Sequence, residues 1–159
     1  MHDIVLTALE VVVARSDFKP TIIHASCVAM RPQNGVLIVG ASGSGKSSLA
    51  LMMMSLGACL VADDRTQLTQ SENGGGLVAR APDNIQHLIE ARGVGLLNAM
   101  AMEECTIQAV VDLDKQEDER LPPMRTRKLL GHDIPVHYRV DAPYFAAALV
   151  QLLKEGRYA

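Results

Sequence analysis

The stretch GASGSGKS, residues 40–47, has the residue types and spacing of a phosphate-binding loop and matches G-x-x-x-x-G-K-[ST] at every fixed position. Glycines within it let successive backbone N–H groups face one concavity, and the helix expected next adds its positive N-terminal end. In such loops the lysine contacts the β- and γ-phosphates of a nucleotide, and the following hydroxyl binds Mg²⁺. The alternative is a glycine-rich turn in which Lys-Ser occurs by chance. The predicted nucleotide-binding residues are Gly40, Ala41, Ser42, Gly43, Ser44, Gly45, Lys46 and Ser47.

Two adjacent carboxylates, Asp63 and Asp64, end the apolar run that follows this loop. One acidic residue at such a strand end holds Mg²⁺ in many nucleotide enzymes, whereas transfer to a hydroxyl needs a carboxylate that takes its proton. Because neighbouring strand residues point to opposite faces, we expect one aspartate to face the metal and the other to face the acceptor. The alternative is an Asx-type turn that ends the strand.

A second glycine-containing stretch, IEARGVGLLN, occupies residues 89–98. Alone it is a weak turn signal, and its Glu90 is equally consistent with a surface charge. His24, on the apolar strand before the phosphate loop, is likewise ambiguous: a lone strand histidine is most often structural, although its pKa near neutrality suits a catalytic role. These residues gain meaning only in combination with the phosphate loop and the two aspartates.

The segments GASGSGKS, LVADD and IEARGVGLLN follow one another as they do in HPr kinase/phosphorylase, and the sequence resembles that family over roughly residues 20–140. The resemblance implies an α/β fold: a single phosphate-loop (Walker A) kinase domain over residues 1–159, with a mixed β-sheet flanked by helices, similar to the family's C-terminal domain. It implies a cytoplasmic serine protein kinase that uses ATP and Mg²⁺ to phosphorylate HPr, the carrier protein of the phosphotransferase system. It also implies a regulatory role and a homo-oligomer, a hexamer in the family.

The same resemblance assigns roles to individual side chains. The second aspartate, Asp64, corresponds to the proton acceptor, and Asp63 to a metal-side or supporting neighbour. Glu90 corresponds to the Mg²⁺-binding glutamate, while Lys46 and Ser47 correspond to the loop lysine and the metal-binding serine. His24 corresponds to a catalytic histidine, although Ala25 replaces the glycine that follows it in the family. Arg120 resembles an arginine on a loop near the phosphates, where it could stabilise transferring charge; the alternative is a charge in a solvated loop.

Two departures from the family pattern affect the expected activity. The chain begins almost at the catalytic strands, as in the short, catalytic-domain-only forms of alphaproteobacteria. The family segment P-V-x-x-G-R-N, which is tied to dephosphorylation by phosphorolysis, is reduced to Pro135 and Val136 within IPVHYRV. The residues expected for phosphorylation are therefore present, whereas part of the motif tied to phosphorolysis is missing.

Two other functions are compatible with the phosphate loop. A small-molecule kinase would use the same loop, but it usually needs a lid and a substrate-binding insertion for which 159 residues leave little room. A regulatory module could bind ATP and a partner without transferring phosphate. Such a module would not need Asp64, so this residue distinguishes it from a kinase.

These side chains require an alternation of strands and helices to position them. The Asn-Gly in RPQNG (31–35) predicts a hairpin, and the apolar run VLIV predicts a strand covered on both faces. Asp141 is a candidate N-cap of the last helix, Pro143 an early helical residue, and Gly57 the end of the helix after the loop. Residues 82–93 are a helix or an extended loop, and 114–128 the expected mobile loop. We predict strands at 21–30, 36–39, 58–63, 66–70, 77–80, 106–113 and 133–140, and helices at 47–57 and 142–156.

Composition favours one globular domain and excludes several partners. The net charge of −3 predicts no electrostatic binding to nucleic acid or to an anionic membrane, and the basic run at 125–128 is too small to change this. Residues 1–17 have no basic region that would precede a signal peptide and are too short to span a bilayer, so we expect a helix or strand packed on the domain. Three cysteines without metal-ligand spacing predict reduced, buried thiols in a cytosolic protein: Cys27, Cys59 and Cys105.

Overall fold

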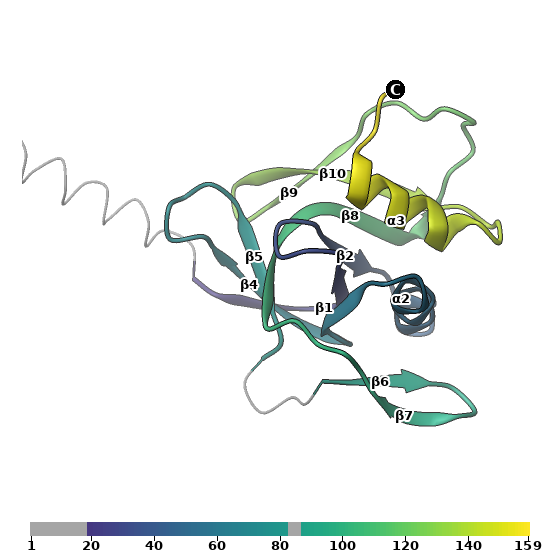
Figure 1. Ribbon diagram of the computed structural model, residues 1–159. Coiled ribbons are helices and arrows are strands. Elements are labelled where there is room, and N and C mark those ends of the chain that lie inside the picture. The colour runs from purple at the N-terminus through teal and green to yellow at the C-terminus, as the bar shows by residue number, and fades with distance from the viewer. Residues whose placement is uncertain (1–18, 83–86) are drawn as a thin grey trace, which may run out of the picture.

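The computed structural model describes residues 19–82 and 87–159 (Figure 1). The prediction of a helix or strand over residues 1–17 lies outside the described residues. Within the two described ranges, no helix is long and apolar enough to cross a lipid bilayer.

The longest strand, β8 (Glu104–Gln116), organises the sheet. The strand before the phosphate loop, β2 (Gly35–Val39), runs parallel to it on one side, and β10 (His132–Arg139) runs parallel to it on the other. The edge strand β9 (Thr126–Leu129) is antiparallel to β10. The predicted mixed direction of the sheet is therefore confirmed.

The remaining strands make the sheet close on itself. The strand that carries His24, β1 (Thr21–Ala29), is antiparallel to β2, to the short β3 (Cys59–Ala62) and to β4 (Arg65–Gln70). From β4 the pairing continues through β5 (Leu77–Arg80) back to β8. Since β8 also pairs with β2, these pairings form a ring. Sequence periodicity predicted the strands but not this barrel-like closure, because closure depends on pairings between distant segments.

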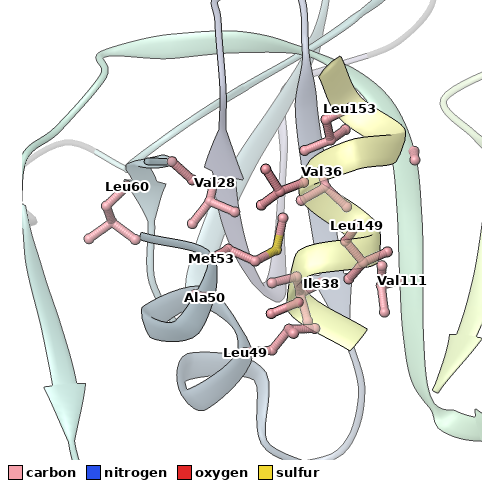
Figure 2. Close-up of a cluster of buried hydrophobic side chains, with 14 of the residues drawn as sticks. Val28, Val36, Ile38, Leu49, Ala50, Met53, Leu60, Val111, Leu149 and Leu153 are labelled. Atoms are coloured by element: carbon pink, nitrogen blue, oxygen red, sulfur yellow. The ribbon is translucent and has the colours of Figure 1, made fainter. Parts of the chain in front are cut away.

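Two hydrophobic clusters cover opposite faces of the strands. On one face, α2 (Lys46–Ser55) and α3 (Phe145–Glu155) contact each other and pack on the sheet (Figure 2). The other cluster lies among the ring strands. Neighbouring residues of β2 go to different clusters, which confirms that this strand is apolar on both faces. The first cluster contains Val28, Val36, Ile38, Met53, Leu149 and Leu153, and the second contains Cys27, Leu37, Leu68, Leu77 and Val110.

All three cysteines are free thiols, as predicted. Cys27 and Cys105 are buried with their sulfur atoms 3.6 Å apart, whereas Cys59 is half-buried. The hydrogen bond to Cys105, together with burial, raises the pKa of Cys27 well above its ordinary value. Cys27 therefore stays a protonated thiol, and both buried side chains contribute packing to the ring core.

Several predicted boundaries are wrong at the C-terminal end. Helix α3 begins at Phe145 after Tyr144, so Asp141 is not its N-cap and Pro143 precedes the helix; no side-chain hydrogen bond caps it. Asp141 instead pairs with Arg139, whose Nε lies 3.1 Å from Oδ1 of the aspartate. Residue propensities alone do not determine where the first turn of α3 begins. In the structure the Asp141 carboxylate pairs with Arg139 at the end of β10 and does not cap the helix.

Two connecting segments also differ from their predictions. The expected loop 114–128 begins and ends in strands, because β8 extends to Gln116 and β9 starts at Thr126, which leaves residues 117–125 between them. In the region 82–93, the described residues contain no helix: β6 (Leu88–Ala91) pairs with β7 (Gly95–Asn98) in a separate antiparallel hairpin. The buried Ile89 attaches this hairpin to the cluster around α2.

Candidate active site

The phosphate loop joins the buried end of β2 to the start of α2. Gly43 and Gly45 have φ values of 83° and 102°, in the left-handed region that disfavours other residues. A Cβ at either position would meet no atom within 4 Å, so conformation rather than crowding explains these glycines. In the fully described α2, Gly45 is the N-cap, no side chain caps the helix, and the first turn has no acidic residue. Its N-terminal N–H groups thus remain available for an anion.

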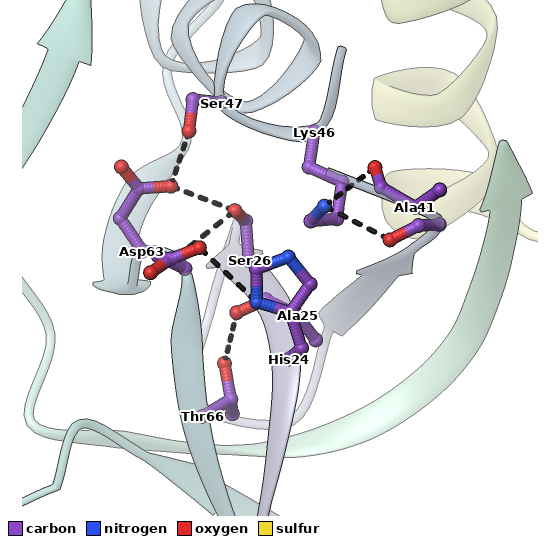
Figure 3. A network of polar contacts seen from close by, with 10 residues as sticks. His24, Ala25, Ser26, Ala41, Lys46, Ser47, Asp63 and Thr66 are labelled. Atoms are coloured by element: carbon purple, nitrogen blue, oxygen red, sulfur yellow. Dashed lines mark hydrogen bonds and ion pairs between the residues drawn. The ribbon is translucent and has the colours of Figure 1, made fainter. Parts of the chain in front are cut away.

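Lys46 lies under the loop rather than in solvent. It is 6% exposed, and its Nζ donates hydrogen bonds to the carbonyl oxygens of Gly40 and Ala41 at 2.9 and 3.0 Å (Figure 3). The N–H of Ala41 in turn donates to Oδ1 of Asp114 at 2.9 Å, which ties the loop to β8. These contacts hold the ammonium group inside the concavity, where it can neutralise a phosphate.

The two aspartates lie just after β3 and make different contacts. Oδ1 of Asp63 accepts hydrogen bonds from the hydroxyls of Ser26 and Ser47 at 2.7 and 2.8 Å. The carboxylate of Asp64 approaches His24, with Oδ1 3.2 Å from Nδ1. The two side chains thus differ in direction, and Ser47, the serine predicted to bind the metal, contacts the first aspartate.

The reason for this divergence is not the strand alternation we expected. Strand β3 ends at Ala62, and Asp64 has a φ of 66°, an uncommon value for a residue with a side chain. The N–H of Arg65 donates to the carbonyl of Asp63 at 2.7 Å, which closes a three-residue turn around Asp64. This backbone turn at the strand end therefore separates the two side chains. It is not the Asx-type turn that the sequence left open, because the acceptor is the main-chain carbonyl of Asp63 and not its carboxylate.

A cavity of about 230 Å³ brings most of the candidate residues together. The phosphate loop and the start of α2 form one part of its lining, and His24 from β1 and Asp64 from the turn form another. Glu90 of β6 reaches it from the hairpin, and the backbone N–H of Glu90 lies 3.5 Å from Oδ2 of Asp63. Cationic and anionic groups thus face one space, as transfer of a phosphoryl group requires.

Arg92 also lines this cavity, and sequence reasoning did not assign it a role. It lies two residues after Glu90, in the stretch IEARGVGLLN that carried the resemblance. Strand alternation gives no signal for it, because β6 ends at Ala91 and Arg92 lies in the turn that leads to β7. A guanidinium there adds a second cation beside Lys46.

Arg120 is not brought to this cavity. It is exposed on the segment 117–125 and is not among the described residues that form the lining. That segment is anchored at its base, because Glu117 and Arg125 form an ion pair and the Arg125 guanidinium lies 4.5 Å above the Tyr138 ring. The catalytic role of Arg120 stays a prediction.

The hydroxyl and carboxylate oxygens at this cavity are of the kind that coordinate Mg²⁺. Among the described residues, no three or more His, Cys, Asp or Glu side chains converge as a metal cage. Mg²⁺ is usually bound by one or two carboxylates together with substrate phosphates and water, so a sparse set of ligands is expected. The Ser47 hydroxyl, hydrogen-bonded to Asp63, and the Glu90 carboxylate of the same cavity supply such a set.

The chain matches a known protein family over most of its length. Residues 18–136 match the family model described as HPr Serine kinase C-terminal domain, and the chain belongs to this family. The resemblance noted from the sequence motifs is thereby confirmed.

Curated relatives and a solved structure extend the comparison. The chain is similar to the HPr kinase/phosphorylase of Brevibacillus brevis, with 40% identity over 114 residues, covering 64% of this chain and 36% of that protein. It is 50% identical over 68 residues to the HPr kinase/phosphorylase of a Geobacillus species, covering 43% of this chain and 22% of the relative. The chain thus spans about a third or less of these relatives.

The solved structure of the Hpr(Ser) kinase/phosphatase from Coxiella burnetii has the same fold. Its TM-score is 0.69 at 22% sequence identity, and the match covers 84% of this chain and 88% of that chain. The mixed sheet with packed helices is therefore a fold shared with this kinase/phosphatase.

Proposed function

We propose that this protein is an ATP- and Mg²⁺-dependent serine kinase whose acceptor is an HPr-type phosphocarrier protein. The observation that carries the proposal is the position of Asp64: its carboxylate lines the same cavity as Lys46 and Ser47 and lies 3.2 Å from His24. A nucleotide-binding loop thus shares one cavity with a carboxylate that can take a proton from an acceptor hydroxyl.

The groups around the cavity suggest the division of labour in this reaction. The loop N–H groups and Lys46 bind the phosphates, and Arg92 adds positive charge opposite them. Ser47 and Glu90 would hold Mg²⁺, with Asp63 orienting Ser47 through their 2.8 Å hydrogen bond. When bound, Mg²⁺ neutralises charge on the β- and γ-phosphates.

The transfer step depends on Asp64 as the acceptor of the hydroxyl proton. The serine oxygen of the acceptor forms a bond to the γ-phosphorus as the bond to the β–γ bridging oxygen breaks, and ADP leaves. The hydroxyl proton passes to the Asp64 carboxylate. His24 fixes the orientation of that carboxylate. The Asp64 side chain is 68% exposed, so an acceptor as large as a protein can reach it.

The resemblance of the sequence and the names of its relatives support HPr as the acceptor. A direct test incubates the protein with ATP, Mg²⁺ and purified HPr-type carrier from the same cell and follows phosphoserine by mass spectrometry. Formation of phosphoserine is the expected result. ATP binding without phosphate on any acceptor would indicate the regulatory module instead, and transfer to a metabolite would indicate a small-molecule kinase.

The same assay tests the direction of the reaction. The segment after Pro135 and Val136 lacks the Gly-Arg-Asn associated with phosphorolysis in the family. We therefore expect the phosphorylated carrier to be stable when inorganic phosphate is added. Release of pyrophosphate and loss of phosphoserine would show that phosphorolysis does not depend on those residues.

A further inference from the structure

Ser26 is a polar residue at a fully buried position of β1. Its exposed fraction is 0%, and the buried residues on both sides of it along the strand, Ala25 and Cys27, are apolar. A hydroxyl in such surroundings needs hydrogen-bond partners, because desolvation without them is unfavourable. Both of its partners belong to the pair of aspartates.

The Ser26 hydroxyl contacts the two aspartates in different ways. It donates its proton to Oδ1 of Asp63 at 2.7 Å, and its oxygen accepts the backbone N–H of Asp64 at 3.4 Å (Figure 3). A serine hydroxyl has one proton and two lone pairs, so both contacts can form together. One side chain therefore joins the carboxylate of the first aspartate to the backbone that carries the second.

We propose that Ser26 is a positioning residue that keeps the two aspartates in their separate orientations, an inference that rests on the kinase function proposed above. On the metal side, Oδ1 of Asp63 is shared by the hydroxyls of Ser26 and Ser47. With both donors present, the carboxylate has one preferred rotation, and the Ser47 oxygen is turned toward the cavity.

On the acceptor side, the backbone of Asp64 needs external support. A residue with a side chain at a φ of 66° is held there only when its surroundings determine it. Strand β1 supplies this support: the N–H of Ala25 donates to the Asp64 carbonyl at 3.0 Å, and His24 is the strand partner of Arg65. The contact from the Asp64 N–H to Ser26 places the preceding peptide group against β1 as well, so both peptide groups that flank this residue contact the strand.

Ser26→Ala tests this role and removes only the hydroxyl. We expect the affinity for Mn²⁺, used as a paramagnetic substitute for Mg²⁺ in complex with a non-hydrolysable ATP analogue, to fall about tenfold or more, as when other groups that orient metal ligands are removed. We also expect kcat for phosphoserine formation to fall while KM for the carrier protein changes little. Ser26→Cys, which keeps the volume and a weak donor, should fall between Ala and wild type.

Thr66→Val is the matched control. Thr66 is also 0% exposed, and its hydroxyl donates at 2.8 Å to the carbonyl of Ala25, not to a carboxylate. Its loss should lower the melting temperature without changing Mn²⁺ affinity. Equal effects of Thr66→Val and Ser26→Ala on Mn²⁺ affinity would overturn the proposal, because they would indicate general loosening of β1.

A double-mutant cycle separates positioning from packing. If Ser26 acts on the metal through Asp63, Ser26→Ala should change Mn²⁺ affinity little once Asp63→Asn is present. Additive losses would contradict the proposal. Unchanged Mn²⁺ affinity in Ser26→Ala, with wild type binding Mn²⁺ and nucleotide, would overturn this inference alone; failure of wild type to bind either would overturn the kinase function with it.

Discussion

The turn that carries Asp63 and Asp64 and the segment 117–125 that carries Arg120 both follow buried strands, yet the structure holds them differently. The turn is bound to β1 by the backbone of Ala25, the hydroxyl of Ser26 and the imidazole of His24. In the segment, the Glu117–Arg125 ion pair closes the base, and residues 118–121 are exposed.

The turn therefore holds its side chains in defined directions, whereas the segment 117–125 exposes side chains that few contacts hold. Carboxylates in the turn have their directions set before any ligand binds, which is what a base and a metal-side acid need. Arg120 extends from a segment tied at its ends, so its position depends on few contacts. The two regions should therefore respond differently to substitution.

The largest expected effect is that of Asp64→Asn. Removal of the proposed proton acceptor should lower phosphoserine formation on the carrier protein by about 100-fold or more, because general base catalysis contributes on that scale. ATP affinity should remain close to that of wild type, since the loop and Lys46 are unchanged. Transfer assays and nucleotide titrations measure the two quantities; transfer at the wild-type rate would show that another group takes the proton.

A smaller effect distinguishes two arginines. Arg92 lines the cavity, so Arg92→Ala should weaken ATP binding by about tenfold, the loss expected for one charge-assisted hydrogen bond. Arg120→Ala is the matched comparison and should change ATP affinity by less than about twofold, within the range of an ordinary surface substitution. Calorimetric titration with ATP and Mg²⁺ measures both. A loss for Arg120→Ala as large as for Arg92→Ala would mean that segment 117–125 reaches the nucleotide.

The smallest effect concerns the base of that segment. The hydrogen bond from Arg125 lowers the pKa of Glu117, so the pair stabilises the folded state above the ordinary glutamate pKa of about 4.3 and loses this contribution as pH falls through the lowered value. Wild type should therefore melt slightly higher than Glu117→Gln at pH 7, and the difference should shrink as the pH falls below about 4.3.

The pH dependence of His137 does not cancel fully in that comparison. Burial and the charge of Arg157 lower the pKa of His137, and the Glu117 carboxylate partly offsets them, so Glu117→Gln lowers this pKa further. The unfolded chain therefore binds the proton first and stability falls as pH drops below about 6.5, slightly more in the variant. A difference in melting temperature that kept growing as the pH fell below the ordinary glutamate pKa of about 4.3 would contradict the assignment of the Glu117 pair.

The same two regions show how far sequence reasoning reaches. The phosphate loop and the strands beside it could be predicted, because fixed residue spacing and local periodicity determine them. The separate directions of the two aspartates were also predicted, but from strand alternation, which is not their cause. The cause of that separation could not be predicted, because the turn at Asp64 depends on β1, a distant segment of the chain. Ser26 carried no signal for the same reason: its partners are recognisable only once β1 lies beside the turn.

Predictions failed mostly where distant contacts decide the outcome. Asp141 is the exception, because it has the residue type of an N-cap but forms an ion pair with Arg139, only two residues before it. The charged composition of 114–128 indicated a loop. Both ends of this segment are in fact strands, because each end pairs with β10. The place of Arg92 in the cavity lining and the exclusion of Arg120 from it both required the structure, because Arg92 lies in a turn that strand alternation does not describe.

The central claim is that the two aspartates have different tasks, Asp63 on the metal side and Asp64 on the acceptor side. The most direct test is the Mg²⁺ dependence of nucleotide affinity in Asp63→Asn and Asp64→Asn, measured side by side with wild type. We predict that Asp63→Asn raises the Mg²⁺ concentration for half-maximal binding by about tenfold or more, as expected for a group that orients a metal ligand, and that Asp64→Asn leaves it unchanged. Equal shifts in the two variants would contradict the division of roles.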